Sequence, residues 1–318
     1  MTRVVESNEV VQRRARRRRH RIKTSSIFVF VMLIYSVLHF CIMWIGVNTN
    51  SILLSFKTYN YLTGTYKFLD FQHLFDNFVT IFKNIDKNVD NYRSMLLSSL
   101  AYFIVSCFVT LPIALFFSYF IFKKILANGF FKVIFFLPSI IPLIILTTIY
   151  SITVGNNGPV GQLLNFMGIQ SANLFLTHES ASWMIWIFCV WAGIGYDVIL
   201  LTAGMSRIPR DILESCKMDG VPTFKEFIHI VIPLTWSTIV TLFIFGMMSV
   251  FTVFLQPFYL APAVNTTWTI GTNIYFAAKG QIALNEPAAL GLFYSLIGAP
   301  IIVGTRSLLN RFFGEVSY

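Results

Sequence analysis

Long apolar stretches dominate the pattern of hydrophobic and polar residues along this chain. A helix that crosses the hydrocarbon core of a membrane needs about 20 apolar residues, because each residue adds about 1.5 Å along the helix axis. Shorter polar segments separate the stretches and are expected to form the loops between membrane-spanning helices. The pattern predicts an all-α integral membrane protein with six transmembrane helices, at approximately Ile27–Val47, Met95–Phe122, Val133–Thr153, Trp183–Gly204, Trp236–Leu255 and Ala288–Thr305.

The composition excludes several other classes of protein. Of the 318 residues, 56% are hydrophobic and only 12% are charged, against about 25% charged residues in an ordinary soluble domain. A soluble fold of this length would lack a polar surface, and the 33 Phe residues exclude a disordered chain. The four cysteines are scattered without a Cys-x-x-Cys pair, which excludes a disulfide scaffold or a zinc module.

The distribution of basic residues predicts the orientation of the spans. Six spans place both termini on one side of the membrane, and the positive-inside rule assigns that side to the cytoplasm. With this topology, 18 of the 24 Lys and Arg residues are cytoplasmic. We therefore expect a multi-pass membrane protein whose two termini are cytoplasmic.

The most basic segment, from Arg13 to Lys23, directly precedes the first apolar stretch. Clustered cations attract the phosphates of nucleic acids and of anionic lipids. Its position favours a topogenic anchor in contact with membrane lipid, and we expect no nucleic acid partner. The apolar stretch that follows is longer than the roughly 7–15 residues of a signal peptide core, so we expect an uncleaved span.

These features divide the chain into segments. An amphipathic stretch, Val160–Met167, predicts a short interfacial helix between the third and fourth spans. The predicted segments are a basic cytoplasmic N-terminus (1–26), a first span (27–47), an extracytoplasmic loop (48–92), a five-span core (93–308) that includes a cytoplasmic loop (206–234), and a cytoplasmic C-terminal tail (309–318).

The cytoplasmic loop between spans four and five predicts two helices joined by a tight turn. Pro209 suits the first turn of a helix because it has no N–H to leave unpaired, and Asp211 favours the positive helix end. Gly220 ends that helix, since glycine adopts the left-handed conformation at low cost. Pro222 then begins a second helix that we expect to run through His229. We call residues 206–234 the elbow.

The elbow resembles the Glu-Ala-Ala signature of binding-protein-dependent ABC importer permeases. Glu214, Gly220, Ile230, Ile232 and Pro233 fall at matching positions. The sequence departs from the signature in the two residues that follow Glu214, where Ser215 and Cys216 replace alanines, and in Ile232, which replaces the usual leucine. Further motifs between residues 95 and 300 resemble the maltose-type carbohydrate branch of this family, among them Leu137-Pro138 and Ala288-Ala289.

The resemblance implies a type I ABC importer permease in a prokaryotic cell membrane, with the elbow docked in a cleft of a cytoplasmic ATPase. It implies four kinds of partner: a second homologous permease, two ATP-binding subunits, an extracytoplasmic solute-binding protein and a carbohydrate substrate. The residues of the elbow that it assigns to ATPase coupling are Arg210, Asp211, Glu214, Ser215, Cys216, Asp219, Gly220 and Pro233.

The chain offers no chemistry of its own for ATP hydrolysis. It has no Gly-Lys dipeptide and therefore no P-loop, so ATP and Mg²⁺ are expected on the partner ATPase and no cofactor in this chain. It also lacks His-Glu-x-x-His and Gly-x-Ser-x-Gly motifs, which argues against a membrane enzyme. We expect no catalytic and no metal-ligating residues.

A few polar and aromatic residues within the spans are candidates for a substrate path. Asp197 is the only acid well inside a span, and it serves either as a substrate or proton site or, as we favour, as a structural hydrogen-bonding group. Aromatic faces and amide groups bind sugars, and the end of span five supplies both. The candidates are Tyr196, Asp197, Phe251, Phe254, Gln256 and Tyr259.

An ion-gradient-driven secondary transporter is the alternative. Such proteins often contain internal repeats and paired intramembrane ionisable groups. This sequence has a single such acid and no detectable repeat. The sequence does not identify the sugar, nor which of two permeases would hold its main site.

Overall fold

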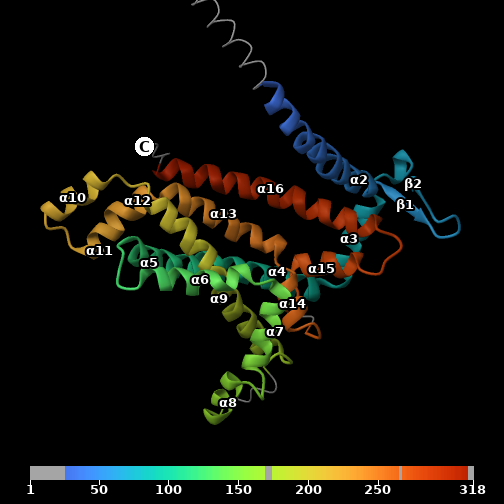
Figure 1. The fold of residues 1–318 in the computed structure, drawn as a ribbon. Coiled ribbons are helices and arrows are strands. Elements are labelled where there is room, and N and C mark those ends of the chain that lie inside the picture. The colour runs from blue at the N-terminus through green and yellow to red at the C-terminus, as the bar shows by residue number, and fades with distance from the viewer. Residues whose placement is uncertain (1–25, 169–173, 265–266, 314–318) are drawn as a thin grey trace, which may run out of the picture. The chain divides into compact units, whose positions relative to one another are not determined.

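The computed structural model describes residues 26–168, 174–264 and 267–313 (Figure 1). The basic run from Arg13 to Lys23 therefore lies outside the described residues. By their internal contacts, residues form two compact units, 1–74 and 75–318. Each unit is described by itself.

The described part of the first unit is a long helix followed by a β-hairpin. The helix runs from Ser26 to Leu54 and includes a π-helix, η1 (Phe40–Gly46), and α2 (Val47–Leu54). Nearly all of its side chains are exposed, as expected for a span that faces lipid.

Two strands follow, β1 (Lys57–Asn60) and β2 (Thr65–Phe68), and then a 3₁₀ turn, η2 (Phe71–His73). The strands pair antiparallel, with Tyr59 opposite Tyr66, and Gly64 turns the chain at φ +67°. The sequence analysis did not predict this hairpin, which is the exception to the all-α architecture.

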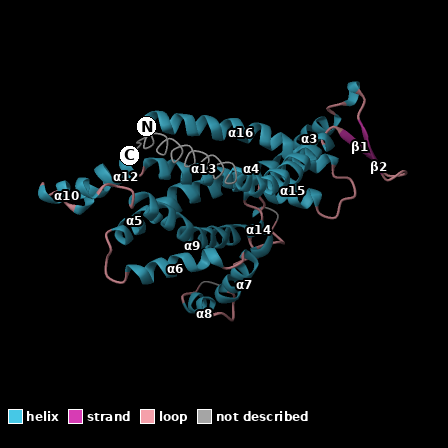
Figure 2. Cartoon of the chain, turned by 45° about the horizontal axis from the view of Figure 1, so that its top comes forward, coloured by secondary structure: helices cyan, strands magenta, loops and turns pink. Residues whose placement is uncertain are grey.

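In its described residues, the second unit consists of helices and the loops that connect them, without a strand. Helices α4 and α5 are joined by a π-helix, η3, into one continuous rod, and α9 and α16 are the other long helices (Figure 2). The elements are α3 (Asp76–Lys87), α4 (Val89–Ile104), η3 (Val105–Thr110), α5 (Leu111–Phe122), α6 (Asn128–Ile140), α7 (Leu143–Val154), α8 (Pro159–Phe166), α9 (His178–Met205), α10 (Arg210–Met218), α11 (Thr223–Glu226), η5 (Phe227–Val231), α12 (Ile232–Leu234), α13 (Trp236–Thr252), α14 (Leu255–Leu260), α15 (Ile270–Ala278) and α16 (Asn285–Phe313).

The described helices agree with six spans. Four are long and apolar enough to cross a membrane, and two further spans result if each of two bent helix pairs counts as one. The bent pairs are residues 128–166, with an angle of 106°, and residues 223–252, with an angle of 74°. The helix predicted at Val160–Met167 is present as α8.

Pro142 marks the sharp bend. It is one of four prolines that the sequence places within the predicted spans: Pro112, Pro138, Pro142 and Pro300. Helix α6 ends at Ile140, and Ile141 is extended with ψ 132° because a residue that precedes proline disfavours the helical conformation. Pro138 and Pro300 instead lie inside α6 and α16, which continue through them. Span three is therefore broken in its middle.

The core lies around α9. This helix packs against α5 and α6, and α13 packs against α4 and α16 (Figure 1). Towards the elbow, Leu201 and Met205 of α9 are fully buried beside Val231. The approach of α6 to α9 requires Gly195, since a Cβ there would lie 1.9 Å from the carbonyl oxygen of Phe135.

Candidate functional site

The turn of the elbow is a Schellman motif. Gly220 has φ +66°, and its N–H donates to the carbonyl of Lys217 at 3.2 Å. The N–H of Val221 donates to the carbonyl of Cys216 at 3.0 Å. These two bonds satisfy the last carbonyls of α10, and only a residue that accepts the left-handed conformation allows them. The predicted role of Gly220 as a helix terminator is confirmed.

Two local details of the elbow differ from the prediction. Pro209 is not in the first turn but precedes it, with ψ 137°, and α10 begins at Arg210. The second helix does not end at His229: it continues through the π-helix η5 and α12 to Leu234. The elbow therefore runs into the fifth span with only Thr235 between α12 and α13.

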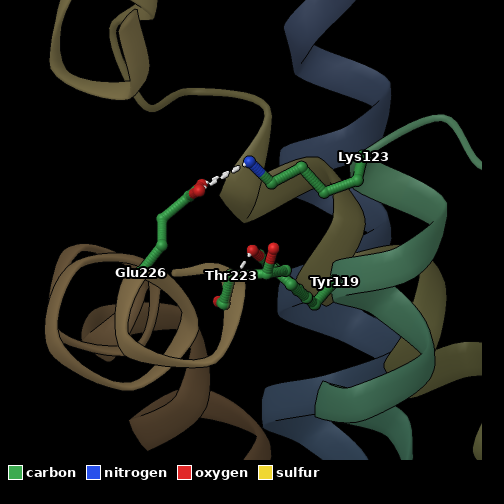
Figure 3. Close-up of polar contacts among 4 residues, drawn as sticks. All are labelled: Tyr119, Lys123, Thr223 and Glu226. Atoms are coloured by element: carbon green, nitrogen blue, oxygen red, sulfur yellow. Dashed lines mark hydrogen bonds and ion pairs between the residues drawn. The ribbon is translucent and has the colours of Figure 1, made fainter. Parts of the chain in front are cut away.

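Two residues hold the elbow against the bundle: Tyr119 on α5, and Lys123, which directly follows α5 (Figure 3). The hydroxyl of Tyr119 donates to the carbonyl of Thr223 at 3.1 Å. The ammonium group of Lys123 donates to Glu226 at 2.8 Å, and the Glu226 side chain is only 5% exposed. The Tyr119 ring also lies 4.8 Å from the ring of Phe227, centroid to centroid. The second helix of the elbow is thus fixed to span two by one buried ion pair, one hydrogen bond and one ring contact.

Sequence analysis missed these anchoring residues. Tyr119 and Lys123 lie four positions apart at the end of an apolar span, and Thr223 and Glu226 lie three apart at the start of a helix. The first spacing places the side chains of Tyr119 and Lys123 on one helix face, whereas Thr223 takes part through its backbone carbonyl. A Lys and a Glu near the same predicted membrane boundary were the available signal, but 103 positions separate the two residues.

The solvent-exposed surface of the elbow is charged along α10 and apolar near the turn at Gly220. Arg210, Asp211, Glu214, Ser215 and Asp219 are exposed. The Ser215 hydroxyl donates to the carbonyl of Asp211 at 2.8 Å.

Two large apolar side chains flank Gly220 on this surface: Met218 is 88% exposed and Phe224 is 72% exposed. Of the other predicted coupling residues, Cys216 is buried against its own chain and Pro233 is half-buried. The exposed tip is therefore amphipathic, as a surface that docks into a partner would be.

A central cavity of about 400 Å³ lies where span three is broken. Residues of seven helical elements line it, from Tyr102 on α4 to Gln256 on α14. The π-helix η3 contributes Ser106 and Thr110 to its wall, and α9 contributes the residues from Phe188 to Asp197. We call it the central cavity.

The structure brings three of the six predicted substrate-path residues together. Tyr196, Asp197 and Gln256 all line the central cavity. Phe251, Phe254 and Tyr259 are not among its lining residues. Phe251 packs towards Gly298 of α16, Phe254 faces the ring of Tyr275 at 5.4 Å, and Tyr259 faces the ring of Phe258 at 5.1 Å.

The Asp197 carboxylate lies in the central cavity rather than in a structural network. No hydrogen bond or ion pair joins it to any of the described residues. The structural hydrogen bond favoured from the sequence is thus not formed within the described part of the chain. A half-buried acid with no bonding partner is an acceptor available to a ligand in the cavity.

The cavity also contains polar residues that sequence analysis missed. Ser139 lies beside the break in span three, and Ser249 lies on α13, seven positions before Gln256. Ser106 and Thr110 are four positions apart and share one face of span two. Polar residues that recur on one face of an apolar span were the available signal. Together with Tyr102, Phe188 and Tyr196, they line the cavity with hydroxyl groups and aromatic rings, which is the chemistry that binds sugars.

Known proteins resemble this chain in sequence. "Probable ABC transporter permease protein YurN" of Bacillus subtilis (strain 168) is 27% identical over 136 residues, which are 42% of this chain and 47% of that protein, so the matched part spans about half of its length. The arabinooligosaccharides transport system permease protein AraP of the same organism is 22% identical over 235 residues, covering 72% of this chain and 75% of the relative.

The fold resembles solved structures as well. A chain in the crystal structure of a bacterial alginate ABC transporter, in complex with an alginate pentasaccharide-bound periplasmic protein, superimposes with a TM-score of 0.76 at 18% identity. The match covers 92% of this chain and 96% of that chain. At that identity the likeness shows the fold alone. The sequence profile of one protein family, the binding-protein-dependent transport system inner membrane components, matches residues 88–314, which are most of the chain. The chain therefore belongs to the family of binding-protein-dependent transport system inner membrane components.

Proposed function

We propose that this permease forms half of the translocation path of an ABC importer for an oligosaccharide, with the elbow coupling it to an ATPase. The observation that carries the proposal is that one helix joins the two sites. Helix α9 lines the central cavity up to Asp197 and ends at Met205, just before the elbow. The two positions are about 12 Å apart along the helix axis. A displacement of the elbow therefore reaches the cavity through one rigid element.

Support for a carbohydrate substrate comes from two sources. The relative AraP is named for arabinooligosaccharides, and the structural neighbour imports alginate. The central cavity independently offers hydroxyl groups, an amide, a carboxylate and aromatic rings within about 400 Å³. That volume lies within the roughly 300–1,000 Å³ of small-molecule sites. An oligosaccharide fits this combination better than an apolar solute.

The proposed assembly contains a second homologous permease, two ATP-binding subunits and an extracytoplasmic solute-binding protein. The structural neighbour was crystallised with a periplasmic protein, which supports the last of these. The elbow and both termini would be cytoplasmic by the positive-inside rule. ATP and Mg²⁺ would bind to the ATPase subunits, while this chain performs no catalysis. Its family supports this division and gives no support to the ion-gradient-driven alternative.

In transport by alternating access, the elbow must transmit enough free energy to switch the permease between its inward-facing and outward-facing states. A change from mostly inward-facing to mostly outward-facing needs about 5.5 kcal/mol of differential binding between the two states. Two elbows, one on each permease, would share this free energy. The ion pair of Lys123 and the buried Glu226 would keep each elbow fixed to its own bundle while this free energy is transmitted.

Purification of the tagged protein from its native membrane tests the proposal. The complex is extracted in two mild detergents, and its subunits are identified and counted by native mass spectrometry. We expect a second permease and two ATPases for each copy of this chain. Recovery of the chain alone or as a self-associated oligomer in both detergents would refute the importer assembly.

A further inference from the structure

A second cavity, at the elbow end of the helices, gathers basic side chains. It has a volume of about 430 Å³ and lies between the end of α5, the start of α6, the end of α9 and α10. We call it the basic cavity. No acidic residue is among the described residues that line it, and its five basic residues are Lys123, Lys124, Lys132, Arg210 and Lys217.

The charge of the basic cavity is only partly compensated. Lys123 is paired with Glu226, whereas no ion pair is formed by Lys124, Lys132, Arg210 or Lys217 with any described residue. Like charges brought together around one hollow repel one another, and an anion in the hollow relieves that repulsion. The helix N-termini of α6 and α10, at Asn128 and Arg210, add partial positive charge. The basic cavity therefore favours an anion.

A buried hydroxyl in the same cavity lacks a partner. The Oγ1 atom of Thr202 is buried and has no hydrogen-bond partner among the described residues, and Thr202 lines the basic cavity. A hydroxyl donates readily to a phosphate oxygen. This atom is an observation independent of the charges, and it adds a hydrogen-bond donor without a partner to the wall of the cavity.

An exposed apolar stripe on α6 begins beside the basic cavity. Its members are 63% (Phe130), 64% (Val133), 53% (Leu137) and 64% (Ile140) exposed. Spacings of three, four and three positions place them on one helix face. Lys132, which lines the cavity, is adjacent to Val133 in the sequence. A cation of the cavity and the first members of the apolar stripe thus lie within one turn of α6.

We propose that the basic cavity binds the phosphate group of an anionic phospholipid of the elbow-side leaflet, whose acyl chains lie along the α6 stripe. Inorganic phosphate shares the oxyanion chemistry, but it would leave the apolar stripe without a ligand. The bound phosphate bridges α10, through Arg210 and Lys217, to the opposite wall, through Lys124 and Lys132. The lipid thereby holds the first helix of the elbow, while the ion pair of Lys123 holds the second.

The test is a lipid titration of the purified full-length chain in neutral detergent, read by native mass spectrometry. The probe is a short-chain phosphatidylglycerol, and phosphatidylcholine of the same chain length serves as the zwitterionic comparison. The cavity variant combines Lys124→Gln, Lys132→Gln and Lys217→Gln. The matched control removes three exposed lysines elsewhere, with Lys67→Gln, Lys83→Gln and Lys87→Gln.

We expect phosphatidylglycerol to bind the cavity variant about 100-fold more weakly than the parent chain, because each Lys near an anionic lipid contributes about 1 kcal/mol. The control should bind like the parent. A third variant with Arg at the three cavity positions should retain binding, which separates loss of charge from misfolding. Phosphatidylcholine should bind much more weakly to every chain.

Two results would overturn the proposal. Equal affinity of the cavity variant and the control for phosphatidylglycerol would show that these cations do not hold lipid. Displacement of the lipid by inorganic phosphate at equal concentration would show that the site takes the free anion. The titration uses this chain alone, so its outcome does not depend on the importer assembly or on transport.

Discussion

The elbow and the central cavity are held together in different ways. The elbow is a run of consecutive residues whose turn closes through two backbone hydrogen bonds and whose second helix is fixed by a buried ion pair. The cavity is lined by residues of seven helical elements between Tyr102 and Gln256, and its acid, Asp197, bonds to no described residue. A coupling element must keep its conformation while it transmits the movement of a partner, whereas a transport site must release its ligand. The difference in bonding matches that difference in task.

Breaking the turn of the elbow should have the largest effect. Gly220→Pro fixes φ near −65° where the turn needs +66°, and it removes the N–H that donates to Lys217. We expect oligosaccharide uptake by the reconstituted complex to fall to background, while membrane insertion remains normal. Gly280→Pro is the matched control, since Gly280 also has a positive φ, +76°, but lies between α15 and α16. Uptake at the parental rate in Gly220→Pro would refute coupling through this turn.

Removing one partner of the buried ion pair should have the next largest effect. Lys123→Met leaves the Glu226 carboxylate buried without a counter-charge, which we expect to cost about 3 kcal/mol of stability. The measurement is thermal unfolding in detergent, with ATPase stimulation by substrate as a second readout. Lys83→Met is the control, because Lys83 on α3 is exposed and forms no ion pair with a described residue.

The double variant Lys123→Met, Glu226→Met sharpens this test. It removes both charges and should recover most of the lost stability, because replacing a buried pair by apolar residues is often nearly neutral. Coupling should not recover with it if the pair also positions the elbow. Equal melting temperatures of Lys123→Met and Lys83→Met would mean that the pair does not hold the elbow.

Neutralising the acid of the central cavity should affect the substrate and not the fold. A hydrogen bond to a charged group is worth about 1.5–3 kcal/mol. If the Asp197 carboxylate accepts from a sugar hydroxyl, Asp197→Asn should raise the substrate concentration for half-maximal uptake about 10- to 100-fold. The melting temperature should not fall, because no described residue bonds to Asp197. A fall in melting temperature with unchanged uptake would assign Asp197 a structural role.

The sequence predicts the elbow better than the cavity because the elbow is local. Proline, glycine and charge positions within 29 residues indicate helix, turn and helix, and the left-handed Gly220 follows from them. The anchor of Lys123 to Glu226 joins residues 103 positions apart, which no local pattern connects. Four prolines within spans indicate bends, but only packing decides that Pro142 breaks its helix and Pro300 does not.

The same limit applies to the substrate path and to the hairpin. Aromatic content favours all of Phe251, Phe254 and Tyr259 equally from sequence, yet Phe251 and Phe254 face neighbouring helices and Tyr259 packs on Phe258 of its own helix. The cavity instead exposes small hydroxyl residues such as Ser139 and Ser249, which look unremarkable in an apolar span. The hairpin at β1 and β2 is short, with four residues in each strand, and each strand offers only one Thr-Tyr pair next to a Lys as a strand signal.

The smallest predicted effect separates two neighbours at the end of span five that sequence analysis treated alike. Gln256 lines the central cavity, and Phe254 packs on Tyr275 outside it. Loss of one neutral hydrogen bond costs about 1 kcal/mol, so Gln256→Leu should raise the half-maximal substrate concentration about fivefold. Phe254→Leu should leave that concentration unchanged while lowering the melting temperature, because it removes a packed ring. The opposite pattern would place the sugar against the aromatic cluster and shift the path from the cavity to the α14–α15 side of the bundle.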